Sequence, residues 1–126
     1  MGDRRAGEPV DRYLVALGAQ DWPALARCLA ADVERIGPYG DVFVERDAYV
    51  AFLQRTVSAL PGYELRVDRL VTTADVVTAE LSETIDTADG RRRTHEAVVF
   101  DVAGDVIHRI AVYLRKSAIV TPGPSG

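Results

Sequence analysis

The sequence is poor in the residues on which several classes of protein depend. It contains one cysteine, Cys28, so an internal disulfide framework is excluded. Lys116 is its only lysine, and a net charge of −4 argues against the basic surface that nucleic-acid binding requires. No apolar run approaches the roughly 18 residues of a membrane span, and the N-terminus lacks the apolar core of a signal peptide. We therefore expect a cytoplasmic protein with neither nucleic acid nor membrane as a partner.

The composition suits one folded domain. Of its 126 residues, 48% are hydrophobic and 27% are charged, which is enough apolar material for a core. We expect a single domain over residues 1–117 and a flexible tail over 118–126, because the chain ends in Thr121-Pro122-Gly123-Pro124-Ser125-Gly126.

No metal or cofactor motif is present in the sequence. A phosphate-binding loop, an HExxH motif and a CxxC pair are all missing. His95 and His108 fall on different predicted strands and on opposite faces, which disfavours a metal site. We expect neither a metal nor a cofactor.

The first half of the chain is predicted to be mainly helical. Apolar residues recur at helical spacing from Pro9 to Leu17, and Asp21 is suited to cap a second helix. Short strands are predicted over 32–36 and 42–44, on either side of the Gly37-Pro38 turn. A third helix is predicted to begin at Asp47 and to end before Pro61-Gly62.

The second half alternates between apolar and polar residues with a period of two, which is typical of half-buried antiparallel strands. Four strands are predicted at about 63–72, 76–86, 91–102 and 106–115, joined by loops short enough for hairpins. Three helices followed by such a meander predict an α+β fold, with the helices covering one face of a strongly curved antiparallel sheet and enclosing a pocket.

Two glutamates interrupt the apolar faces of neighbouring strands. A hairpin turn at Ala88-Asp89 pairs Glu83 with Thr94 and Leu81 with Glu96, so both glutamates should face the same side. Burial and mutual repulsion would raise at least one carboxyl pKa, as a proton-transfer group requires. We assign Glu96 as the acid/base and Glu83 as its partner or as a group that holds the substrate. Alternatively, either glutamate pairs with an arginine or lies at a dimer interface.

The last two strands are predicted to pair Phe100 with His108 and Glu96 with Val112. This register places His108 on the inner face, and the alternation of the first long strand does the same for Arg69. His108 could equally be a packed histidine, and Arg69 could neutralise a nearby acid. We assign His108 and Arg69 as substrate contacts, Arg69 for a substrate carboxylate. The other assigned contacts are apolar, namely Val98, Phe100 and Val112 on the same strand faces and Phe52 on the apolar stripe of the third helix.

The chain resembles the NTF2-like superfamily, and within it the ketosteroid isomerase and SnoaL-like polyketide cyclase branches. The resemblance rests on residues 10–22, on Leu29-Ala30-Ala31-Asp32-Val33, on the Gly37-Pro38 turn and on the hairpin that ends Arg109-Ile110-Ala111-Val112-Tyr113. It implies a cone-shaped fold, a small apolar or amphipathic ligand and a homodimer formed through the outer sheet face, where Leu70, Val99 and Ala111 are expected.

The same resemblance suggests roles for two tyrosines. Tyr13 aligns with a tyrosine that serves as an oxyanion donor in the isomerase branch, and Tyr39 would face the pocket mouth. Tyr13 could equally be a core residue, and Tyr39 a surface turn residue. The chain also departs from the isomerase pattern, because Gly37 and Val98 stand where that branch has its two catalytic carboxyl groups.

Two functions follow from these observations. The first is a cofactor-independent enzyme that isomerises, cyclises, dehydrates or hydrolyses an apolar oxygenated metabolite by proton transfer, with Glu96, Glu83 and Tyr13 as its catalytic groups. The second is a non-catalytic ligand-binding or dimerisation module. The two glutamates favour the enzyme, since a passive apolar pocket has no need of them.

Overall fold

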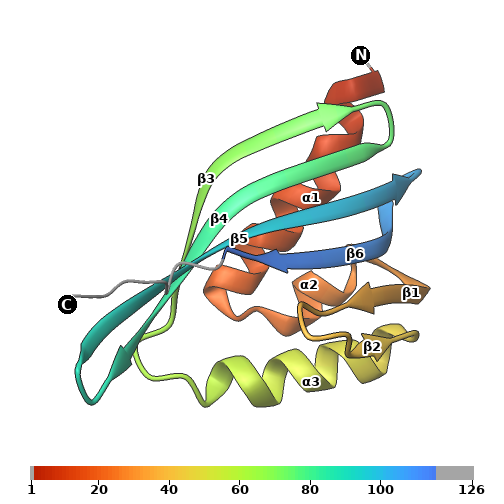
Figure 1. Cartoon of the computed structure of the whole chain (residues 1–126). Coiled ribbons are helices and arrows are strands. Elements are labelled where there is room, and N and C mark those ends of the chain that lie inside the picture. The colour runs from red at the N-terminus through yellow and green to blue at the C-terminus, as the bar shows by residue number, and fades with distance from the viewer. Residues whose placement is uncertain (1, 116–126) are drawn as a thin grey trace.

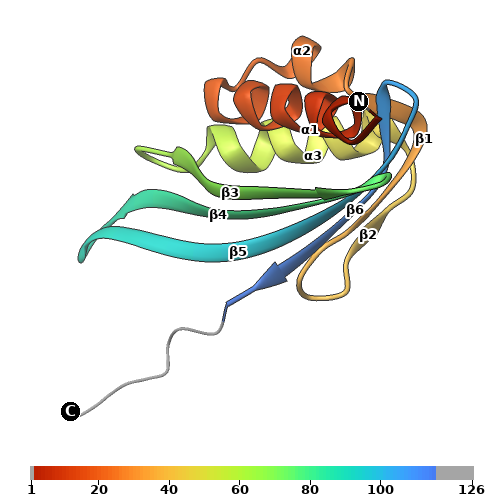
Figure 2. The same ribbon diagram turned by 90° about the horizontal axis from the view of Figure 1, so that it is seen from above.

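The structure, a computed structural model, describes residues 2–115, so the tail predicted over 118–126 lies outside the described residues. In chain order the elements are α1 (Gly2–Ala19), α2 (Trp22–Ala26), β1 (Leu29–Ile36), β2 (Val42–Phe43), α3 (Arg46–Ser58), β3 (Glu64–Thr73), β4 (Val76–Thr87), β5 (Gly90–Ala103) and β6 (Val106–Leu114). The three helices lie on one side of the sheet, which curves beneath them (Figures 1 and 2). The predicted α+β class is confirmed.

The helices begin and end where local chemistry allows. The predicted cap of α2 is confirmed, because the Asp21 side chain accepts a hydrogen bond from the Ala24 N–H at 3.2 Å. Helix α1 begins seven residues before Pro9, the residue at which its start was predicted. Gly62 lies in the turn between α3 and β3, where its φ is +65°, a conformation that favours glycine.

The six strands form one sheet in the order β2-β1-β6-β5-β4-β3. All neighbours are antiparallel except β1 and β6, which run parallel. This parallel contact was not predicted, because it joins segments separated by α3 and four strands. It brings β1 beside the last hairpin and so places β1 side chains in the wall of the interior.

The predicted pairing of β4 with β5 is confirmed. Leu81 lies opposite Glu96 and Glu83 lies opposite Thr94. The loop between these strands is short, and both inner faces are apolar, so a shifted register would turn apolar side chains towards solvent. Glu83 and Glu96 therefore share the inner face of the sheet.

The predicted register of β5 with β6 is wrong. Phe100 pairs with Ile110, and Glu96 pairs with Leu114. A β-bulge leaves His108 without a partner on β5 and turns the neighbouring Ile107 into the core, where it is fully buried. His108 is consequently exposed, away from the predicted pocket.

A second bulge overturns the placement of Arg69. The register of β3 against β4 shifts between Val67 and Arg69, so the inward alternation resumes at Leu70. Leu70 thus packs against the core, contrary to its predicted place on the outer face. Arg69 is exposed and forms an ion pair with Glu80 at 3.0 Å.

The core lies between the helices and the inner face of the sheet. Its largest fully buried side chains include Phe100, Leu25, Leu29, Ile107, Ile110, Val10, Val33 and Val77. Within residues 2–115, no helix combines the length and the apolar character needed to cross a membrane.

Candidate active site

A small cavity of about 60 Å³ lies inside the fold, between the inner face of the sheet and helices α1 and α3. Most of its wall is apolar, but five polar side chains interrupt it. They are Tyr13 from α1, Arg35 from β1, Tyr49 from α3, Glu83 from β4 and Glu96 from β5. The cavity has room for a group of a few atoms, so it suits the reacting end of a ligand.

The two glutamates are neighbours on this wall. Burial, a hydrogen bond with Glu83 and the charge of Glu83 raise the pKa of Glu96 from 4.5 to about 9, and the Arg35 charge opposes this increase. Within the part of the chain that the structure describes, neither glutamate forms an ion pair with an arginine. Glu96 is therefore a carboxylic acid at neutral pH, able to donate a proton.

Tyr63, which directly precedes β3, supports the second glutamate. Its hydroxyl donates a hydrogen bond to Glu83 Oε2. Burial and the adjacent Glu83 charge raise the pKa of Tyr63, so its phenol keeps its proton. This hydrogen bond orients the Glu83 carboxyl group and leaves its other oxygen available to Glu96 or to a ligand.

A pair of buried tyrosines forms the opposite wall. The hydroxyl groups of Tyr13 and Tyr49 are 2.5 Å apart, and both side chains are almost completely buried. Burial raises the pKa of each, so both remain neutral phenols. Because one hydroxyl donates to the other, the pair retains one further O–H donor for a ligand oxygen. The Tyr13 ring packs edge-on against Phe100, with ring centroids 5.6 Å apart.

Arg35 completes the polar wall. Its Nη1 donates to Asp41 Oδ2 at 2.8 Å, and its guanidinium group packs against the rings of Tyr49 and Phe52 at 5.6 and 5.5 Å. Gly37 leaves room for this ion pair, because a Cβ atom on residue 37 would overlap Asp41 Oδ1 and lie 2.6 Å from Arg35 Nη1, so both side chains would have to shift.

The structure brings together most of the residues that the sequence indicated. Six of them line the cavity, namely Glu96, Glu83, Tyr13, Val98, Phe100 and Val112. Phe52 lies behind this wall, against Arg35 and against the ring of Phe43 at 4.7 Å. Whether these residues act on a substrate stays a prediction.

Three predicted substrate contacts do not reach the cavity. Bulges place His108 and Arg69 outside, as described above. Tyr39 is 85% exposed, because the turn that carries it closes with a hydrogen bond from Gly40 N to Gly37 O and points the ring into solvent.

Sequence reasoning missed Arg35, Tyr49 and Tyr63. Arg35 alternates with the fully buried Val33 on β1, so it interrupts an apolar strand face as the two glutamates do. That signal was available in the sequence. Tyr49 and Tyr63 gave no such signal, because an aromatic residue on an apolar stripe is indistinguishable from a core residue.

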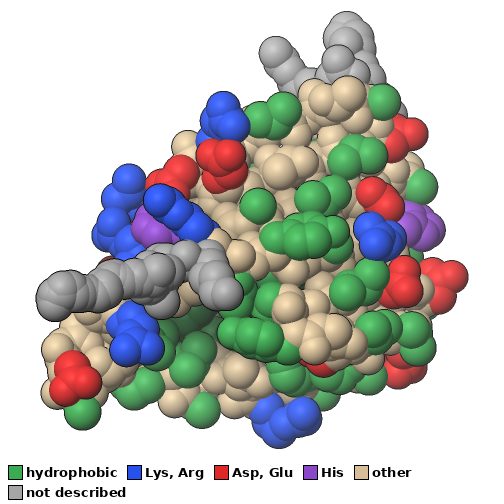
Figure 3. Space-filling view, in the orientation of Figure 1, with side chains coloured by type: hydrophobic (Ala, Val, Ile, Leu, Met, Phe, Trp, Pro, Cys, Tyr) green, Lys and Arg blue, Asp and Glu red, His purple; other side chains and the backbone are tan. Residues whose placement is uncertain are grey.

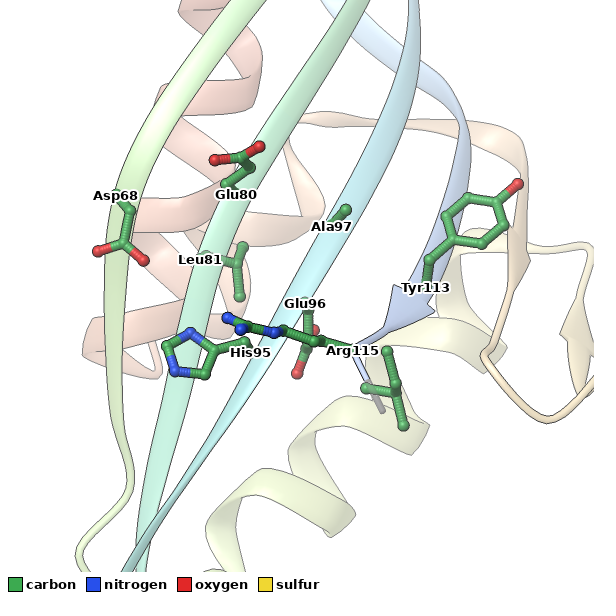
Figure 4. A pocket seen from close by; sticks show the side chains of 9 residues that line it. Asp68, Glu80, Leu81, His95, Glu96, Ala97, Tyr113 and Arg115 are labelled. Carbon is green, nitrogen blue, oxygen red and sulfur yellow. The ribbon is translucent and has the colours of Figure 1, made fainter. Parts of the chain in front are cut away.

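A groove of about 470 Å³ lies on the outer side of the sheet, beyond the end of β6 (Figure 4). It is lined by Asp68, Glu80, Leu81, His95, Glu96, Ala97, Tyr113, Leu114 and Arg115. Leu81 and Glu96 line both this groove and the interior cavity. The groove and the interior cavity therefore adjoin each other at Leu81 and Glu96.

The described residues 2–115 contain no group of three His, Cys, Asp or Glu side chains placed to hold a metal ion. The polar groups of the cavity are instead two carboxyls, two phenols and a guanidinium group. Such a set can donate, accept and transfer protons.

Substituting Glu83→Gln is expected to lower the pKa of Glu96 below about 9 while leaving it above 4.5. The substitution removes the neighbouring charge, but burial, the largest cause of the increase, remains. A carbon-13 NMR titration of the glutamate carboxyl groups, assigned with Glu96→Gln, measures the change. A Glu96 that titrates near 4.5 in the unsubstituted protein would contradict the described cavity.

Comparisons with known proteins agree with this fold. The sequence profile of the SnoaL-like domain matches residues 10–111. No curated protein sequence matches the chain. A candidate ketosteroid isomerase from Kribbella flavida is similar in structure, with 20% identity, coverage of 96% of this chain and 85% of that chain, and a TM-score of 0.82.

Two further solved structures are similar. A candidate polyketide cyclase from Xanthomonas campestris shares 26% identity, covering 90% of this chain and 92% of that chain, with a TM-score of 0.73. An epoxide hydrolase of the LEH-like type from M. tuberculosis shares 18% identity, covering 90% of this chain and 84% of that chain, with a TM-score of 0.78. At identities this low, the likenesses establish the fold, while the activities in these names are those of the other proteins.

Proposed function

Because the chain belongs to the SnoaL-like family, whose profile matches residues 10–111, we propose that it is an enzyme that transfers a proton on a small, apolar, oxygen-containing molecule. The observation that carries the proposal is the neutral carboxylic acid of Glu96 beside the second carboxyl of Glu83, on an otherwise apolar wall. Structural relatives named as isomerase, cyclase and epoxide hydrolase support the general class.

In the proposed reaction one glutamate acts as the base and the other as the acid. Glu83 accepts a proton from the substrate, and Glu96 donates its own proton to another substrate atom. The proton then passes from Glu83 to Glu96 across the hydrogen bond between them, which restores the starting state. Tyr63 holds Glu83 in place, and the free O–H donor of the Tyr13–Tyr49 pair binds a substrate oxygen.

The net reaction is an isomerisation if both protons exchange with carbon. It is a cyclisation or dehydration if one exchanges with carbon and the other with oxygen, and a hydrolysis if Glu83 takes its proton from a water molecule that attacks the substrate while Glu96 protonates the leaving oxygen. The usual isomerase arrangement is not part of the proposal, because Gly37 and Val98 replace its two carboxyl groups. The pair at 83 and 96 is a different placement of two acids on the same fold.

Deuterium incorporation tests the proposal without knowledge of the substrate. We expect the protein in D2O to exchange carbon-bound hydrogen in at least one member of a panel of small ketones, esters and epoxides, followed by proton NMR. Glu96→Gln should lower that rate by roughly 100-fold or more, as loss of an acid/base group typically does. Glu64→Gln is the matched control, because Glu64 is exposed on β3 and paired with Arg91. Equal rates in wild type and Glu96→Gln would refute the assignment.

A non-catalytic binding module is the second candidate. It is favoured by the small volume of the cavity, about 60 Å³, and by the missing isomerase carboxyl groups. Under this alternative the protein retains a ligand but exchanges no hydrogen. Native mass spectrometry of the purified protein would reveal such a ligand.

We also propose a homodimer formed through the outer face of the sheet. Hydrophobic side chains gather on this face (Figure 3), and Val71, Val76 and Tyr113 are among its exposed members. Ala111 and Val99 lie beside them on neighbouring strands. The same native mass spectrum reports the dimer.

A further inference from the structure

Arg35 is the one cationic side chain among the residues that line the interior cavity, and one of its donors has no acceptor. Its side chain is 11% exposed. Nη1 is paired with Asp41, whereas the Nε atom is buried and lacks a hydrogen-bond partner within the described residues. A buried donor without an acceptor destabilises the folded protein. A ligand that offered an acceptor at this point would remove that destabilisation.

The guanidinium group is held in place before any ligand arrives. The rings of Tyr49 and Phe52 pack against it, and Asp41 fixes Nη1. The Asp41 carboxylate occupies the space beside residue 37 that the absent glycine side chain leaves open. A donor whose direction is fixed in this way needs little ordering when it binds an oxygen.

The charges around Arg35 select the kind of oxygen. Asp41 already balances the guanidinium charge, and Glu83 and Glu96 form the neighbouring wall. A ligand carboxylate placed here would lie close to the charges of Asp41 and Glu83 and be repelled by them, whereas the neutral Glu96 would not contribute. A neutral acceptor oxygen would be bound by Nε–H without that repulsion.

We infer that Arg35 Nε–H binds a neutral acceptor oxygen of the substrate, such as a carbonyl oxygen, and thereby selects neutral oxygenated molecules over carboxylates. The inference rests on the proposed active site and names its ligand class. Arg35 is in this sense a binding residue, whereas the proton is moved by the glutamates.

Acetone and acetate are matched probes for this inference, since they have the same number of heavy atoms and differ in charge. The Nε–H signal of Arg35 can be followed by nitrogen-15 NMR and assigned by its loss in Arg35→Lys. We expect acetone to shift this signal in a saturable manner and acetate at equal concentration to shift it much less. A stronger response to acetate would overturn the inference, as would acetone-induced shifts of the Val98 and Val112 methyl groups with no response at Nε–H.

The Arg35→Lys variant keeps a cation near Asp41 and removes Nε–H. It is expected to weaken acetone binding, read from the Val98 and Val112 methyl signals, by roughly tenfold to 100-fold, which is the range for a hydrogen bond to a charged group. Unchanged affinity would overturn the inference. Because binding is read without turnover, the result is independent of the deuterium experiment. Glu96→Gln should still bind acetone even if it catalyses nothing.

Discussion

Raising the pH from about 4.5 to about 9 is expected to destabilise the wild-type protein strongly and to affect Glu96→Gln much less. The unfolded chain releases the Glu96 proton near 4.5, whereas the folded protein holds it until about 9. Between these values the folded state holds the Glu96 proton and the unfolded state does not, so the contribution of Glu96 to stability is fully present below pH 4.5 and is lost as the pH rises towards 9. The slope should approach 1.4 kcal/mol per pH unit, roughly the free energy of one pKa unit.

Urea unfolding of both proteins at several pH values between 4.5 and 9 measures this effect as a difference. Other groups titrate in both proteins, so their contributions cancel in the comparison. Glu64→Gln, which removes an exposed carboxyl group, should retain the wild-type slope. Parallel curves for wild type and Glu96→Gln would mean that Glu96 is ionised in the folded protein, and the proton-donor role would be lost with it.

Substituting Phe100→Ala is expected to cost roughly 3–5 kcal/mol of unfolding free energy, the usual range for removing a buried phenylalanine. Phe100 is fully buried and contacts the Tyr13 ring edge-on at 5.6 Å. It also lines the interior cavity, so the space left by its ring would join the existing volume. The loss should be visible in the urea midpoint at constant pH.

Phe100→Leu is the matched control, with an expected loss below about 1.5 kcal/mol because most of the volume is retained. Benzene should restore part of the stability of Phe100→Ala, since an enlarged apolar cavity binds such ligands. If Phe100→Ala lost less than 1 kcal/mol and did not respond to benzene, the ring would not be filling the core as described.

The sequence was most informative where local signals determine the geometry. The loop between β4 and β5 is so short that the pairing of Glu96 with Leu81 follows from the turn and from the alternation of apolar residues. The joint placement of Glu83 and Glu96 could therefore be predicted. The cap of α2 by Asp21 depends on equally local chemistry.

The wrong predictions arose where one extra residue in a strand shifts the alternation of inward-facing and outward-facing side chains. A bulge at His108 lets Ile107 enter the core, and a bulge before Arg69 does the same for Leu70. Each bulge turns one further apolar side chain into the core. The stability gained in this way depends on the elements that pack over that part of the strand. The pattern within the strand does not contain that information, so His108 and Arg69 were assigned to the wrong face.

The side chain that β1 contributes to the cavity could not be predicted from neighbouring residues in the sequence, for a different reason. Arg35 reaches the cavity because β1 runs parallel to β6, and parallel partners are separated by long connections in the chain. Its polar character on an apolar face was visible in the sequence. Its neighbours Tyr49 and Asp41 became apparent only when the elements were assembled.

The space beside Gly37 also has an evolutionary consequence. The Asp41 oxygens fill the position that any side chain on residue 37 would need. A single-base change in a glycine codon can produce aspartate there, but the new carboxylate would expel Asp41 and take Arg35 as its own partner. The two arrangements compete for Arg35, so a lineage that gains an acid at position 37 is expected to lose or move the Asp41–Arg35 pair. A homologue carrying acids at both positions should have lost the arginine or rebuilt the turn.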